Sequence, residues 1–216
     1  MDLTQHQIRV LGCLIEKQLT TPDYYPLTLS ALTNACNQKS SRDPVMNLSE
    51  SEVLDAIQGL IDLNLAREQQ MAGARVLKYA HKLSGTLTKQ FDMSQNELGV
   101  LAVLFVRGPQ TVGEIRTRTN RMCEFSSLAD VESVLDKLAT KSGGPYVAPL
   151  AREPGRREIR YQHLFGDSSV EVSDVNVEVE EAKPASNNEL DELRKDIAEL
   201  REELNELKEI VAILTD

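Results

Sequence analysis

The stretch 111–160 constrains the fold most strongly, because it passes from helical to extended patterns over a short length of chain. Two helices are expected in it, and the second begins at Ser127 with Asp130 as its capping-box partner. Residues 146–150 and 158–162 are expected to form two strands, because a basic Pro-Gly turn separates two strand-like runs. Two helices followed by a hairpin predict a winged helix.

The N-terminal part of the chain repeats this order of features. Thr4 and Ser49 begin helices with capping boxes, and a shorter helix is expected over 28–37. Two strand-like runs follow at 65–69 and 75–80, around a second glycine-containing turn. Because the same succession occurs twice, the sequence predicts two winged-helix domains in tandem.

The predicted fold class is mainly α with small β wings (α+β), comprising two tandem winged-helix domains plus a C-terminal coiled-coil helix. The boundaries follow from the repeat and from the change in composition after it. The predicted parts are a first domain at 1–82, a linker at 83–92, a second domain at 93–165, an acidic flexible linker at 166–187 and a coiled-coil helix at 188–216.

Negative charge is concentrated at the C-terminal end of the chain. The net charge is −10, and residues 166–216 alone hold 16 acidic and 5 basic side chains. Residues 1–165 hold 18 acidic and 19 basic side chains, so nucleic-acid binding by this part is left open. The composition of 166–187 favours a flexible linker, and a single edge strand at 175–179 is the alternative.

The C-terminal residues carry an uninterrupted heptad pattern that predicts self-association. Charges at its g and e positions are complementary, as in Glu189 with Arg194 and Asp196 with Arg201, which favours a parallel dimer. The alternative is an amphipathic helix that folds back on the preceding domains. The predicted oligomerisation residues are Leu190, Leu193, Ile197, Leu200, Leu204, Leu207, Val211 and Leu214.

The helices that would enter the major groove in a DNA-reading winged helix are acidic in this chain. The helix expected over 49–63 contains four acidic residues and no lysine or arginine. The helix expected over 127–139 contains three acidic residues and one lysine. Because acidic side chains repel phosphates, we do not expect these helices to read base sequence.

Basic residues gather instead on or just after the helix expected over 111–120, on the hairpin of the second domain, and in one loop of the first domain. As a functional set they would contact DNA phosphates. Alternatively, they form surface ion pairs with nearby glutamates, such as Glu114 and Glu158, that contribute little. The candidate nucleic-acid-binding residues are Arg116, Arg118, Arg121, Arg152, Arg156, Arg157, Arg160, Lys39 and Arg42.

The sequence shows no catalytic constellation, metal-ligand spacing or cofactor-binding motif. Cys13, Cys36 and Cys123 are far apart, and we interpret them as core residues. The N-terminus lacks a signal-like pattern, and no apolar run approaches membrane-spanning length. We therefore expect a cytoplasmic protein without enzymatic activity, cofactor or metal.

Five longer motifs are LIEKQLTTP at 14–22, YPL at 25–27, ACNQK at 35–39, RDPVMNLSESE at 42–52 and LAREPG at 150–155. These motifs resemble the YceH family of bacterial proteins, and the likeness covers roughly residues 1–165. The resemblance implies a tandem winged-helix fold, in agreement with the pattern of helices and strands. It implies no activity, because that family is uncharacterised.

Two functions fit these features. The first is a DNA-binding regulatory protein that holds phosphates through the basic wing of the second domain and its helix at 111–120. The alternative is a protein–protein interaction scaffold that uses the acidic helices and the coiled-coil tail. The expected partners are DNA or an unknown protein, together with a second copy of the chain, and no membrane.

Overall fold

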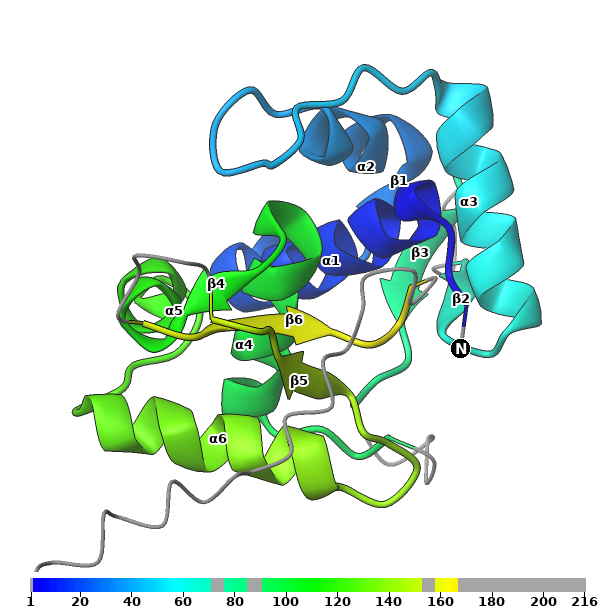
Figure 1. Ribbon diagram of the computed structural model, residues 1–216. Coiled ribbons are helices and arrows are strands. Elements are labelled where there is room, and N and C mark those ends of the chain that lie inside the picture. The colour runs from blue at the N-terminus through cyan, green and yellow to red at the C-terminus, as the bar shows by residue number, and fades with distance from the viewer. Residues whose placement is uncertain (1, 71–75, 85–90, 153–157, 167–216) are drawn as a thin grey trace, which may run out of the picture. The chain divides into compact units, whose positions relative to one another are not determined.

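The computed structural model describes residues 2–70, 76–84, 91–152 and 158–166 (Figure 1). All of these residues belong to one compact unit, Met1–Ser173. The acidic linker and the coiled-coil helix predicted after residue 166 lie outside the described residues.

The first half of this unit contains three α-helices and a three-stranded antiparallel sheet with the strand order β1-β3-β2. Its elements are α1 (Gln5–Thr20), a short 3-10 turn (Pro22–Tyr24), β1 (Leu27–Thr28), α2 (Leu29–Cys36), α3 (Glu50–Asp62), β2 (Ala66–Gln69) and β3 (Lys78–His81).

The second half repeats this arrangement, with the strand order β4-β6-β5 in its own antiparallel sheet. Its elements are α4 (Gln95–Arg107), β4 (Gln110–Thr111), α5 (Val112–Thr119), α6 (Leu128–Thr140), β5 (Val147–Pro149) and β6 (Arg160–His163). The fold is therefore mixed α and β, and the order of elements in the first half recurs in the second.

Local sequence explains where the longer helices begin. The capping boxes predicted at Thr4, Ser49 and Ser127 are confirmed, and α4 begins with another at Ser94. In each of the four, the side-chain oxygen accepts a hydrogen bond from the backbone N–H of the third helical residue. Each predicted strand is also present, with boundaries shifted by at most a few residues.

The strands β1 and β4 were not predicted from the sequence. Each has only two residues, which is too short to show the alternation by which a strand is recognised. Both lie directly before a helix and pair with the last strand of their own sheet. Only tertiary pairing therefore identifies them.

The two halves contact each other chiefly through α1 and α4, which lie side by side (Figure 1). Every residue of 97–106 in α4 is buried, so this helix has a core environment on all sides. A backbone hydrogen bond of 2.7 Å from Leu3 N to Phe165 O also ties the start of the first half to the end of the second. One continuous hydrophobic core results.

The closest approach of the two helices depends on Gly12. A Cβ atom at this position would lie 2.7 Å from Phe105 Cβ and 2.9 Å from Val106 Cγ1, both of which belong to α4. These distances are shorter than van der Waals contact, so a side chain at position 12 would push α1 and α4 apart.

Replacing Gly12 by Ala is expected to lower the free energy of unfolding by about 1–3 kcal/mol, because it overpacks the α1–α4 contact. Gly113→Ala in α5 is the matched control, since a Cβ there meets no atom within 4 Å. This control is expected to raise stability by about 0.5–1 kcal/mol, through loss of glycine flexibility in a helix. Urea unfolding followed by circular dichroism measures both changes, and equal stability of the two variants would contradict the close packing.

Candidate functional site

The structure divides the predicted basic residues among several places. Lys39 lines a single cleft together with Arg118 and Arg121, which are far from it in the sequence. Arg116 lies in a different hollow, together with Thr117, Asn120, Glu124 and Phe125. The predicted set therefore does not form one uniform patch.

The cleft has a volume of about 680 Å³ and is formed by both halves of the unit. The C-terminal turn of α1 and the loop after α2 contribute from the first half, and α4 and the end of α5 contribute from the second. Two further basic residues, Lys17 and Arg107, line it. Among the described residues that line the cleft, five are cationic and Glu16 is the only acid.

Lys17 and Arg107 were not among the residues predicted from the sequence. The internal repeat nevertheless shows that they occupy equivalent positions. Each lies at the same distance along the chain from the N-cap of its helix, Thr4 for α1 and Ser94 for α4. Equivalent positions of the two repeats therefore bring both cations to one cleft. An alignment of the two halves of the sequence would have identified Lys17 and Arg107 together, whereas a search for clusters of basic residues did not.

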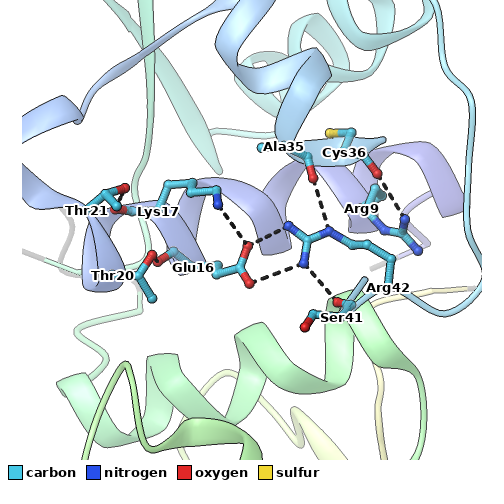
Figure 2. Close-up of polar contacts among 9 residues, drawn as sticks. All are labelled: Arg9, Glu16, Lys17, Thr20, Thr21, Ala35, Cys36, Ser41 and Arg42. Carbon is cyan, nitrogen blue, oxygen red and sulfur yellow. Dashed lines mark hydrogen bonds and ion pairs between the residues drawn. The ribbon is translucent and has the colours of Figure 1, made fainter. Parts of the chain in front are cut away.

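The Glu16 carboxylate is neutralised by a buried guanidinium (Figure 2). Arg42 donates hydrogen bonds of 3.2 and 2.5 Å to the two carboxylate oxygens of Glu16. It also donates to the carbonyl oxygens of Ala35, at 3.1 Å, and of Ser41, at 2.9 Å. The Arg42 side chain is fully buried, whereas the side chain of Glu16 remains 16% exposed.

This geometry corrects the assignment of Arg42 to the nucleic-acid-binding set. Its donors are directed into the protein, so the guanidinium is not presented to a ligand at the surface. Burial alone would lower the pKa of Arg42, but Cys13 and the hydrogen-bonded carboxylate of Glu16 outweigh that effect and raise it. Arg42 therefore stays charged and cancels the charge of the one acid in the cleft.

A second buried arginine, Arg9, helps to fix the loop between α2 and α3. It donates hydrogen bonds to the carbonyl oxygens of Cys36, at 3.2 Å, and Pro44, at 2.7 Å (Figure 2 shows the first). The same loop bonds to the other half, because Asp43 N donates to Val106 O at 2.8 Å. These contacts hold the loop segment that contains Lys39 against the rim of the cleft.

Arg107 has a strongly cationic environment. Burial, and next the positive charge of Arg118, lower the pKa of the Arg107 guanidinium. Within the part of the chain that the structure describes, Arg107, Lys39 and Arg121 take part in no ion pair. Their charges are therefore available to an anion.

Glu114 joins α5 to the last strand of the second sheet. Its carboxylate oxygens lie 3.2 Å from Arg118 and 3.8 Å from Arg160. Burial opposes ionisation of Glu114, but the N–H of Thr111 and the two arginines together hold its pKa below the ordinary value. The sequence left open that the basic residues form ion pairs with nearby glutamates. Arg118 and Arg160 do so, because both contact the carboxylate of Glu114.

The remaining predicted residues are placed separately. Arg116 projects from α5 roughly 200° away from Arg118 by helical geometry. It donates to the carbonyl oxygens of Phe125, at 3.3 Å, and Ser126, at 2.9 Å, and so stabilises the loop before α6. Arg152 is exposed just after β5. Arg156 and Arg157 lie outside the described residues.

The three cysteines are free and buried, as predicted for core residues. A hydrogen bond with Cys13 and burial raise the pKa of the Cys36 thiol, which disfavours the thiolate form of a nucleophile. The described residues contain no group of three or more potential metal ligands. They also contain no helix with the length and apolar character needed to cross a membrane.

The fold and the cleft define a protein of two repeated α/β halves with a cationic cleft where those halves meet. Residues 3–156 match the family model described as a protein of unknown function, DUF480. The chain belongs to this family, which agrees with the resemblance to YceH proteins.

Curated relatives carry the family name UPF0502. One from Aliivibrio fischeri strain MJ11 is 47% identical over 212 residues, covering 87% of this chain and 98% of the relative. One from Vibrio cholerae strain O395 is 50% identical over 165 residues, covering 76% of each chain. One from Vibrio vulnificus strain YJ016 is 53% identical over 164 residues, covering 76% of this chain and 74% of the relative.

Removing the buried partner of Glu16 is expected to destabilise the protein. Arg42→Met should lower the free energy of unfolding by about 3–5 kcal/mol, because it leaves a partly buried carboxylate uncompensated. Combining it with Glu16→Leu should recover much of this loss, since both charges are then absent. Lys17→Met is the control, because its contact with Glu16 is long, at 3.9 Å, and should matter by less than about 0.5 kcal/mol. Urea unfolding of the unaltered protein, both single variants Arg42→Met and Glu16→Leu, the double variant and Lys17→Met tests this. A double variant whose loss of stability equals the sum of the two single losses would refute the coupling.

Proposed function

We propose that this protein is a non-enzymatic, DNA-binding regulatory protein built from two winged-helix domains. Each half has the order helix, short strand, helix, helix and hairpin, with the last strand in the middle of its sheet. This is the order of elements in winged-helix domains, which commonly contact DNA. The likeness of fold is an analogy, so the proposal rests on the surface of the second half.

The observation that carries the proposal is the ion-pair network around Glu114. It places α5 beside β6, the strand that follows the predicted basic wing. Cations from separate stretches of the chain thereby belong to neighbouring elements. Arg118 and Arg121 come from α5 and its following loop, and Arg160 comes from β6. Phosphate contact through Arg118 and Arg160 would require a phosphate oxygen to replace Glu114 as their partner, whereas Arg121 takes part in no ion pair among the described residues.

The acidic side chains exposed on α3 and α6 make it unfavourable for either helix to contact DNA bases. Glu50, Asp55 and Asp62 are exposed on α3, and Glu132 and Asp136 are exposed on α6. These carboxylates would be repelled by phosphates if either helix entered the major groove. We therefore propose that DNA is held through its backbone, with little discrimination between sequences.

Replacing Arg152, Arg156 and Arg157 together by Ala is expected to weaken DNA binding at least about tenfold at low salt. The dependence of log Kd on log salt concentration should also become shallower, by about one unit for each phosphate group that the variant no longer binds. Fluorescence anisotropy with two unrelated duplexes at several salt concentrations measures both effects, which should be the same for the two sequences.

The matched control for this experiment is Arg67→Ala/Lys78→Ala/Lys82→Ala. It removes the same charge from the sheet of the first half and should change the affinity less than threefold. Equal weakening by the two triple variants would show that net charge alone attracts DNA. Absence of binding by the unaltered protein would exclude the function.

The alternative function as an interaction scaffold has one observation in its favour. Leu54 and Leu63 at α3 and Leu128 at the start of α6 are 40%, 46% and 47% exposed. Apolar side chains among exposed carboxylates are suited to a protein partner with a basic, apolar surface. A partner that binds the unaltered protein but not Leu54→Ala/Leu63→Ala would favour this function over DNA binding.

We also propose that the protein forms a parallel dimer through the heptad residues after position 188, which lie outside the described residues. The leucines at position d of every heptad favour pairing of two helices. The complementary charges at positions g and e favour a parallel orientation.

Replacing Leu200 and Leu207 by Lys is expected to convert this dimer into a monomer, because two charged side chains would lie at d positions of each helix. Ile210→Lys is the control, since position 210 falls outside the seam and should leave the dimer intact. Sedimentation equilibrium distinguishes the two states. A dimer that survives both d-position changes would show that the tail does not hold the copies together.

A further inference from the structure

We propose that the cleft between α1 and α4 binds a small, multiply phosphorylated molecule of about nucleotide size. The site shares Arg118 and Arg121 with the proposed DNA contact but contains none of the wing residues Arg152, Arg156 and Arg157. Its ligand would contact both halves of the protein at once, because each half supplies part of the lining.

The first argument is the internal symmetry of the lining. Lys17 and Arg107 occupy equivalent positions in α1 and α4, counted from their N-caps. The pairs 38–39 and 121–122 also line the cleft at equivalent positions after Thr28 and Thr111, although the cation is the second residue in one pair (Lys39) and the first in the other (Arg121). Cations therefore approach the cleft from two facing sides, which suits a ligand with more than one negative group.

The second argument is the balance of charge. Five cationic side chains line the cleft; Arg118 is paired with Glu114, and the single carboxylate among the described lining residues, Glu16, is bound by Arg42. Burial, and next the positive charge of Arg118, lower the pKa of Arg107. A polyanion would relieve this repulsion, and charge-assisted hydrogen bonds from arginine and lysine are the usual means of holding phosphate groups.

The third argument is the size of the cleft and the character of its floor. A volume of about 680 Å³ lies within the range of small-molecule sites, and a concave site of this kind encloses a ligand. Ala102, Val103 and Val106 of α4, with Met122, lie beneath the cleft and are almost fully buried, so the exposed lining is mainly polar and cationic.

The lining also indicates how specificity would be divided. Phosphate groups would contact the cations of both halves, whereas the buried apolar residues of α4 offer little surface to the organic group. The described lining contains no aromatic side chain, so a base would not be held by stacking. We therefore infer a site that recognises the number of phosphates more strongly than the identity of the attached group.

Isothermal titration of the full-length chain with ATP, AMP and inorganic tripolyphosphate, without magnesium, tests this inference. ATP is expected to bind with one site per chain, and AMP at least about tenfold more weakly because it has fewer charges. Comparison with tripolyphosphate distinguishes an inorganic polyphosphate from a phosphate ester as the ligand. If it binds as tightly as ATP, the ligand is an inorganic polyphosphate, and if it binds more weakly, the ligand is a phosphate ester.

Lys17→Gln/Arg107→Gln is expected to weaken ATP binding on the order of 100-fold, at roughly tenfold for each charged contact. Lys78→Gln/Lys137→Gln removes the same charge outside the cleft and should change the affinity less than threefold. If the cleft variant unfolds, Lys17→Gln alone should still weaken binding about tenfold, because Lys17 is on the partly exposed rim.

Three results would overturn the inference. They are absence of ATP and tripolyphosphate binding, equal weakening by the cleft and control variants, and AMP binding as tightly as ATP. The wing variant Arg152→Ala/Arg156→Ala/Arg157→Ala separates this inference from the proposed function. It should lose affinity for DNA and retain its affinity for ATP.

Discussion

The close contact between α1 and α4 governs the arrangement of the whole described unit. Gly12 allows the backbone of α1 to approach Phe105 and Val106 of α4 more closely than any side chain would permit. Because both helices are the first helix of a repeat, their contact relates the two halves through equivalent elements. The same contact brings the helix ends that carry Lys17 and Arg107 to one cleft.

Buried arginines connect this packing to the charge of the surface. Arg9 and Arg42 hold the loop after α2 by hydrogen bonds to backbone carbonyl groups, and Arg42 also binds Glu16. A buried ion pair contributes little net stability, but loss of one partner is strongly unfavourable. At the surface, the negative charge of Glu16 is largely balanced by Arg42, although Glu16 also lies 3.9 Å from Lys17. The buried Arg42–Glu16 ion pair therefore contributes to the positive charge of the cleft.

Acidic and basic side chains occupy different parts of the surface. Exposed carboxylates occupy α3 and α6, whereas cations occupy the cleft, α5 and the edge of β6. In a protein with two winged-helix domains, phosphates would then be contacted by α5 and the hairpin. The helices α3 and α6, which correspond to those that usually enter the major groove, would not contact them. An anion in the cleft would bind both halves together, so occupancy of the cleft would favour the α1–α4 arrangement described above.

The sequence by itself determined the elements whose signals are local. Capping boxes located the longer helices, and periodicity and turn residues located the hairpin strands, because both depend on neighbours a few residues apart. Tertiary structure alone decided the two-residue strands β1 and β4, the burial of Arg42 and the convergence of Lys39 with Arg107. Each of these depends on contacts between residues distant in the chain, and a basic side chain has the same local pattern whether it meets solvent or a buried carboxylate.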